Sequence, residues 1–312
     1  MAGTIREIGE SEAESFYRGN LSRRMDAFSK ATGGFLRYED LAAYRPDFVE
    51  PLRVDYRGYT VWELPPNGDG MIALMTLNML STFEPGQGTA DIHRRIEALK
   101  LAFADGQAHL GDPVSMRLTS AELLSPAYAR QRSALIGENA LLPVAGNPRG
   151  SGTIYLCTAD GDGNMVSLIQ SNYMGFGSGV VIPGTGISLQ NRGCGFSMNP
   201  QLPNCYGPGK KAFHTIIPGF LTREGRAVGP FGVMGGFMQP QGHVQVVTGL
   251  LDLHLNPQDA LDAPRWQWTG EKRILLEKDF PEDVREDLKR RGHEVTVTED
   301  SGSFGRGHCI LR

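Results

Sequence analysis

The sequence predicts an α+β fold in which helices cover a core built from two β-sheets. Three observations indicate this class. Apolar side chains recur mostly at helical spacing before Thr153, whereas residues 153–233 alternate short apolar strands with glycine turns. Helical spacing then returns at 238–253 and 281–291. A chain of 312 residues has room for about two domains or one large layered domain.

In the first half, residues typical of caps and turns predict where each helix or strand begins and ends. A helix from Leu21 to Phe28 is expected to stop at Thr32-Gly33-Gly34, and two short strands are expected between Leu52 and Leu64. Asp69 is expected to cap a helix from Met71 to Leu80. Two further helices are expected at 91–109 and 126–136, so this half is mostly helical.

The second half is predicted to contain most of the sheet. Its first two strands flank the polar turn Asp160-Gly161-Asp162-Gly163-Asn164 and form a β-hairpin. The strands that we expect by alternation and turn signals are 153–159, 164–171, 179–182, 186–190, 215–222 and 226–233. Residues 260–265 are expected to form a short connection between the last two helices.

Composition excludes several classes of function. The net charge of −4 gives no electrostatic reason to expect binding to nucleic acid or to an anionic membrane. No segment approaches the roughly 18 apolar residues of a spanning helix, and Met1–Glu10 lacks the pattern of a signal peptide. We therefore expect a soluble, cytoplasmic protein. The four cysteines and seven histidines show no metal-ligand spacing, so no metal and no cofactor are expected.

Thr153 is the candidate nucleophile. The small and polar approach Asn147–Gly152 is expected to be exposed, and cleavage there would leave a threonine carrying both a hydroxyl and a free α-amine. That pairing is a known way to activate a nucleophile. The alternative interpretation is that Thr153 merely opens a strand, where threonine is common.

Gly235-Gly236 is the candidate oxyanion site. The pair follows a strand and precedes a helix, which places backbone N–H groups at a helix N-terminus. The alternative is a tight strand-to-helix turn without a ligand.

The ordered run of motifs resembles the γ-glutamyltranspeptidase family of N-terminal-nucleophile hydrolases. The segments that resemble this family are spread over the chain: Ala13–Gly19, Glu39–Tyr44, Asp55–Tyr59, Leu101–Asp105, Leu110–Pro113, Thr153–Val166, Phe176-Gly177, Thr185–Ile187, Pro208–Lys210, Gly235-Gly236 and Asp262–Arg265. The resemblance implies a four-layer αββα sandwich that is truncated at both ends relative to the family. It also implies that 1–152 is the C-terminal part of the large subunit and that 153–312 is the small subunit, both made from one precursor.

The resemblance implies roles for individual residues. The bond between Gly152 and Thr153 would be cut autocatalytically, and the Thr153 hydroxyl would then attack a γ-glutamyl-type amide. Ser171 would orient this nucleophile, and the N–H groups of Gly235 and Gly236 would form the oxyanion hole. Water or an amino acid or peptide acceptor would release the acyl group.

The resemblance also assigns the substrate-binding positions. His214 and Thr215 occupy the place of two serines that hold the substrate carboxylate. Tyr173 stands where the family has an asparagine that touches the substrate amino group, and Gly195 replaces the carboxylate that pairs with the glutamyl α-ammonium. Arg192 brings a cation close by.

A site that loses an anion and gains a cation should bind an ammonium less well and a carboxylate better. The sequence therefore predicts a preference for glutaryl-type amides over γ-glutamyl, glutathione-type amides. One alternative is that Arg192 is a solvated loop residue and specificity is unchanged. A second alternative, from another class of protein, is an unprocessed and inactive family fragment that only binds a ligand or a partner subunit.

Overall fold

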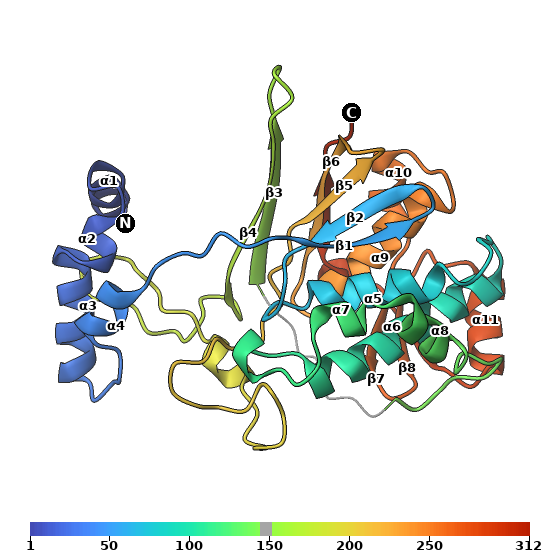
Figure 1. The fold of residues 1–312 in the computed structure, drawn as a ribbon, viewed down its shortest axis with the longest axis horizontal. Helices are drawn as coiled ribbons and strands as arrows, with labels where there is room; N and C mark the ends of the chain where they lie inside the picture. Colours follow the sequence, from blue (N-terminus) through green and yellow to red (C-terminus); the bar gives the residue numbers. More distant parts are fainter. Residues whose placement is uncertain (144–151) are drawn as a thin grey trace. The chain divides into compact units, whose positions relative to one another are not determined.

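The computed structural model describes residues 1–143 and 152–312, and it confirms the α+β class. The chain forms two compact units (Figure 1). The first unit contains Met1–Val49 and Asn172–Asn191, and the second contains Glu50–Ser171 and Arg192–Arg312. The predicted large-subunit part, 1–152, and small subunit, 153–312, would arise by cleavage of the chain. The two compact units do not test this cleavage, so the division at residue 153 stays a prediction.

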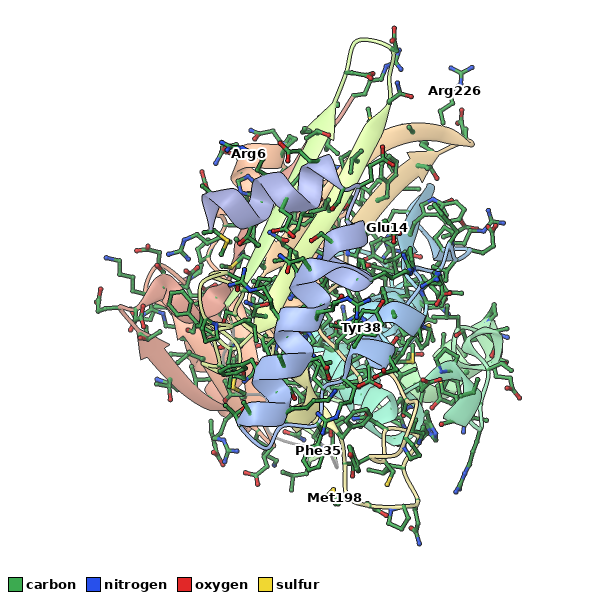
Figure 2. The ribbon with its side chains drawn as sticks, turned by 90° about the vertical axis from the view of Figure 1, so that its left-hand side faces the viewer. Arg6, Glu14, Phe35, Tyr38, Met198 and Arg226 are labelled. Atoms are coloured by element: carbon green, nitrogen blue, oxygen red, sulfur yellow. The ribbon has the colours of Figure 1, made fainter. Side chains whose placement is uncertain are left out.

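The first unit joins the N-terminal helices to the segment 172–191. Its helices are α1 (Ala2–Glu10), α2 (Glu14–Tyr17), α3 (Asn20–Ala31) and α4 (Tyr38–Ala43). Thr4 Oγ1 donates a hydrogen bond to the carbonyl oxygen of Thr185 at 2.7 Å, and Arg24 Nη2 donates to that of Pro183 at 2.8 Å. Phe35, in the loop after α3, is 93% exposed (Figure 2).

The strands expected at 179–182 and 186–190 are not formed. Only an isolated bridge joins Val181 to Ser188 among the described residues. Gly184 and Gly186 both have positive φ angles, of 70° and 74°, which close a tight turn and leave too few residues for a ladder.

The second unit contains the sheets. A five-stranded antiparallel sheet has the order β1 (Leu52–Tyr56), β2 (Tyr59–Glu63), β5 (Gly219–Arg223), β6 (Arg226–Met234) and β10 (Arg306–Cys309). A hairpin is formed by β3 (Gly152–Ala159) and β4 (Met165–Tyr173). A third sheet contains β7 (Trp266–Gly270), β8 (Arg273–Glu277) and β9 (Glu294–Thr298).

Seven α-helices of the second unit lie within its described residues. They are α5 (Gly70–Leu80), α6 (Thr89–His109), α7 (Ser120–Leu123), α8 (Pro126–Ser133), α9 (Met238–Leu251), α10 (Pro257–Asp262) and α11 (Glu282–Arg290). Every α5 residue except Asn78 is buried, because this helix lies between the sheet and α6. No helix in the described part of the chain has both the length and the apolar composition needed to cross a membrane.

Strand β6 lies between a helix on one face and the hairpin on the other (Figure 1). Successive residues of a strand point to opposite faces. Val233 faces α9, where a Cβ added to Gly242 would lie 2.7 Å from Val233 Cγ1. Its neighbour Gly232 faces β3, where a Cβ would lie 2.6 Å from Tyr155 Cδ2. The stacking of hairpin, sheet and helices supplies three layers of the predicted αββα arrangement.

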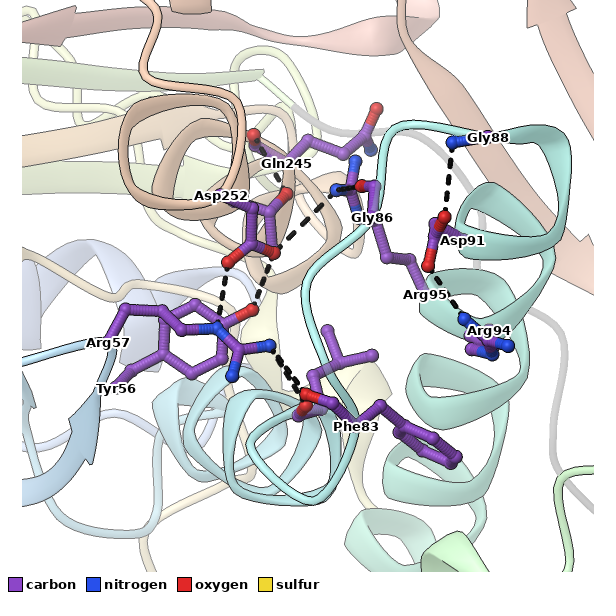
Figure 3. A network of polar contacts seen from close by, with 12 residues as sticks. Tyr56, Arg57, Phe83, Gly86, Gly88, Asp91, Arg94, Arg95, Gln245 and Asp252 are labelled. Carbon is purple, nitrogen blue, oxygen red and sulfur yellow. Dashed lines mark hydrogen bonds and ion pairs between the residues drawn. The ribbon is translucent and has the colours of Figure 1, made fainter.

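A buried polar network fixes the C-terminal end of α9 (Figure 3). Asp252 accepts a hydrogen bond from the Tyr56 hydroxyl at 2.7 Å and another from Arg57 Nε at 3.0 Å. Arg95 Nη2 lies 3.6 Å from the same carboxylate. Burial and the Asp252 charge raise the pKa of Tyr56, so its hydroxyl keeps the proton that it donates. These contacts tie α9 to β1 and α6.

Candidate active site

Thr153 lies near the start of β3 and is 4% exposed. Its Oγ1 donates a hydrogen bond to Ser171 Oγ on β4, at 3.1 Å. The hairpin turn at residues 160–164 sets this pairing across the two strands. The predicted exposed approach to Thr153 lies, up to Ser151, outside the described residues.

Gly235 and Gly236 form the turn between β6 and α9. Their φ angles are 136° and 60°, which side-chain-bearing residues rarely adopt. The carbonyl oxygens of Gly235 and Gly236 accept hydrogen bonds from Met238 N at 3.1 Å and Gln239 N at 2.9 Å. The two glycines therefore stand immediately before the first turn of α9, where the helix dipole favours negative charge.

The stacked strands bring Thr153 toward this turn. Near the hairpin tip, a Cβ at Gly163 would lie 3.3 Å from Arg312 Nη1, and Arg312 N donates to Val228 O at 2.9 Å. The hairpin tip therefore lies near the start of β6, while Tyr155 packs on Gly232 near its end.

It follows that β3 and β6 run in opposite directions across the stack. Thr153 precedes Tyr155 by two residues, and Gly235 follows Gly232 by three, so both lie at the same end of the two strands. The candidate nucleophile and the candidate oxyanion turn thus share one end of the stack.

His214 and Thr215 lie in the segment that leads into β5. The strand was expected at 215–222, but β5 begins only at Gly219, because Pro218 has no N–H group for a ladder. His214 Nδ1 accepts a hydrogen bond from Ile216 N at 3.1 Å. Burial, followed by the charges of Arg192 and Lys211, lowers the pKa of His214 to about 4. The imidazole is therefore neutral near pH 7, and its Nε2 carries the proton.

The prediction that the Asp69 side chain caps the helix at 71–80 is wrong. Asp69 occupies the N-cap position of α5, but its side chain makes no capping hydrogen bond. Its backbone angles, φ −87° and ψ 12°, lie outside the extended region that capping side chains need. Its N–H instead donates to His214 O at 2.9 Å.

The Asp69 carboxyl group is completely buried, and neither of its oxygens has a hydrogen-bond partner among the described residues. Burial raises the pKa of Asp69 well above its usual range, and the nearby Glu63 raises it further. The charge of Arg192 acts in the opposite direction. Only the run Pro65–Gly70 marked this region in the sequence, and it carries no sign that an aspartate side chain turns inward.

The three remaining predicted substrate-binding positions are Arg192, Gly195 and Tyr173. Arg192 opens the 3-10 turn Arg192–Gly195, and its charge reaches both Asp69 and His214. Gly195 is exposed at the end of that turn. Tyr173 belongs to the first unit, where it is 8% exposed with a φ of 79°, and its predicted role stays a prediction.

One buried group outside this site has the residue types of a metal centre. The ligand atoms of His93, Glu97 and His293 lie within 4.8 Å of one another. Both ring nitrogens of His93 are taken up by protein groups, because His93 bonds to Gly137 O at 3.0 Å and to His293 Nε2 at 2.9 Å. Lys100 Nζ lies 2.7 Å from Glu97 Oε1, and its charge opposes a cation there.

The buried threonine at the start of a hairpin, the glycine turn at the same end of the strand stack and the stacked sheets are those of the N-terminal-nucleophile hydrolase fold. The sequence model of the gamma-glutamyltranspeptidase family matches residues 1–312, and the chain belongs to this family.

Three relatives illustrate the similarity. The crystal structure of cephalosporin acylase from Bacillus halodurans has 56% identity and a TM-score of 0.96, with 100% of this chain and 58% of that chain covered. The glutathione hydrolase-like YwrD proenzyme of Bacillus subtilis is 37% identical over 96% of this chain and 59% of its own length. The oxamate amidohydrolase proenzyme of Klebsiella pneumoniae is 33% identical, with 100% and 61% covered. The chain thus spans about three fifths of these relatives.

Proposed function

We propose that this chain cuts itself before Thr153 and then uses the freed threonine to hydrolyse amides through an acyl-enzyme. The observation that carries the proposal is the buried hydroxyl of Thr153, held by Ser171 at 3.1 Å. It lies at the end of the strand stack where Gly235 and Gly236 form their turn.

The chemistry proceeds in two halves. The new α-amine of Thr153 takes the hydroxyl proton, and Oγ1 attacks the amide carbonyl while Ser171 keeps the hydroxyl oriented. Backbone N–H groups of Gly235 and Gly236 stabilise the oxyanion, and the amine leaves with the proton. Water, or an amino acid or peptide acceptor, then attacks the acyl-enzyme and frees Thr153.

The proposed acyl group ends in a carboxylate and lacks an α-amine, as in a glutaryl amide. In support, Gly195 supplies no carboxylate for an ammonium, and the charge of Arg192 acts at His214. Two of the relatives are called cephalosporin acylase and oxamate amidohydrolase, and oxamate carries a carboxylate but no amine. The name glutathione hydrolase-like for a third relative keeps γ-glutamyl amides as the competing substrate class.

Processing is tested by intact-mass spectrometry of the purified protein and of Thr153→Ala. We expect two fragments from the wild type, one of them beginning at Thr153, and a single full-length chain from the variant. If the wild-type protein stays full-length, the result would support the alternative interpretation that this chain is an unprocessed and inactive family fragment.

Specificity is tested by comparing kcat/KM for glutaryl-p-nitroanilide and γ-glutamyl-p-nitroanilide with the processed protein. We expect glutaryl-p-nitroanilide to be favoured by about tenfold or more, the effect of one charge-assisted contact. A preference for the γ-glutamyl compound would overturn the assignment of the acyl group while leaving the reaction class intact.

A further inference from the structure

Among the buried polar side chains of the described residues that have atoms without a hydrogen-bond partner, four are gathered near the start of α9. Their unpaired atoms are both Asp69 carboxyl oxygens, Glu63 Oε2, Thr215 Oγ1 and Gln239 Nε2. Each of the four residues is 1% exposed or less. Buried polar groups are nearly always paired, so a group of unpaired ones in a single place points to a missing ligand.

Backbone contacts place these four side chains together. Asp69 N bonds to His214 O at 2.9 Å, directly before Thr215. Gln239 Oε1 accepts from Ile217 N at 3.4 Å, two residues after Thr215. A Cβ at Gly70 would lie 3.2 Å from Glu63 Oε2, which puts Glu63 beside the first residue of α5.

The group lies next to the proposed oxyanion turn. Gln239 belongs to the first turn of α9 and bonds through its N–H to the Gly236 carbonyl at 2.9 Å. Glu63 Oε1 lies 2.6 Å from His243 Nδ1, and His243 Nε2 accepts from Val233 N at 3.2 Å, two residues before Gly235. An acyl group whose carbonyl sits at Gly235-Gly236 therefore has these side chains within its reach.

The side-chain amide of Gln239 indicates which kind of ligand group can bind beside these four side chains. Its Oε1 is occupied by the Ile217 N–H, so the side of the amide that faces the group is Nε2, which can only donate. A ligand ammonium also only donates and cannot satisfy it. A ligand carboxylate accepts, and it can bond to Gln239 Nε2 and to the Thr215 hydroxyl together.

We propose that Asp69 is a specificity-determining residue of the acyl subsite, where its un-ionised carboxyl group donates a hydrogen bond to the carboxylate at the end of the acyl group. Thr215 and Gln239 donate beside it. This inference rests on the proposed function, and it adds to it the group that recognises the far end of the substrate.

The surroundings of Asp69 favour the un-ionised form. Glu63 on β2 faces it with a second carboxyl group, and water is excluded from both. His214, in the segment before β5, is neutral near pH 7, and Arg192 is the charged group that opposes protonation. Binding of a dicarboxylate should therefore weaken as pH rises and Asp69 ionises.

The test measures glutarate binding by titration calorimetry, at about pH 6 and about pH 9. We expect Asp69→Ala to weaken binding by about tenfold or more at the lower pH. Asp69→Asn keeps an N–H donor, so we expect binding within about threefold of wild type and little change with pH. Asp105→Asn replaces a buried carboxylate of α6 that is paired with Arg132 of α8, and should leave glutarate affinity unchanged.

Three results would overturn the inference: no glutarate binding by wild type, wild-type affinity in Asp69→Ala, or a loss in Asp69→Ala of L-glutamate binding alone. The last result would make Asp69 a receptor for an ammonium group. Neither variant removes a hydrogen bond made by the Asp69 side chain, and circular dichroism will verify that both fold. If glutarate binds through Asp69 but no amide is hydrolysed, the proposed function fails and this inference stands.

Discussion

Replacing Gly232 with alanine tests how Thr153 is brought to the glycine turn. The new Cβ would lie 2.6 Å from Tyr155 Cδ2, whereas carbon atoms pack at about 3.5–4.0 Å, so the overlap is roughly 1 Å. β6 cannot move away, because Val233 on its other face already packs against Gly242 of α9. We expect Gly232→Ala to lower the free energy of unfolding by about 1–3 kcal/mol, measured by urea denaturation.

The same substitution should slow self-cleavage. Tyr155 and Thr153 lie on one face of β3, so a shift of about 1 Å at Tyr155 carries Thr153 with it and costs about 100-fold in rate. A mass-spectrometric time course of the precursor measures this rate. Gly137→Ala is the matched control, because a Cβ at Gly137 meets nothing within 4 Å. Wild-type stability and cleavage in Gly232→Ala would refute the stacking of β3 on β6.

Three further predictions follow from single contacts. Ser171→Ala should slow cleavage before Thr153 by about tenfold, and Ser171→Thr should restore most of the rate, as followed by the same time course. Asp252→Ala leaves Arg57 without its carboxylate and should lower the free energy of unfolding by about 3 kcal/mol in urea. Burial lowers the pKa of His293 to about 3, so the unfolded chain binds the extra proton below about pH 6.5. Stability should therefore fall as pH drops from about 6.5 to about 3, and thermal melts of His293→Gln should show a smaller fall.

Local patterns were enough to predict much of the fold. The alternation and the glycine turn at 160–164 predicted the hairpin, and helical spacing predicted α6 and α9 to within two residues at each end. These elements are long and strongly periodic, so their hydrogen bonds form between near neighbours in the chain.

The third sheet could not be predicted in the same way. Trp266–Gly270 and Arg273–Glu277 are short, and β8 pairs in parallel with β9, across a helix. β10 joins the main sheet at β6, more than seventy residues earlier in the chain. β7 and β8 form a local hairpin but have only five residues each, and β9 and β10 pair non-locally, so these four strands were missed.

In the candidate site too, residues that are marked by their neighbours in sequence could be predicted, whereas a residue defined by distant contacts could not. Thr153 and Gly235-Gly236 could be found from their neighbours in sequence, because a strand start and a strand-to-helix turn are local features. Asp69 could not, because an aspartate before a helix is ordinarily a cap. Burial and the neighbouring Glu63 raise the pKa of its carboxyl group, and only the folded chain creates that environment.

The two ends of α9 differ in how completely their buried polar groups are hydrogen-bonded. At the C-terminal end, both oxygens of Asp252 accept hydrogen bonds, from Tyr56 and Arg57. At the N-terminal end, Gln239 Nε2 is buried and has no hydrogen-bond partner among the described residues, and the same holds for the carboxyl group of Asp69. A helix end that served stability alone would pair these groups or replace them with apolar ones, since each unpaired group costs about 1–3 kcal/mol. Their retention beside the glycine turn is consistent with a substrate that supplies the missing acceptors, which would make α9 an anchor at one end and a binding surface at the other.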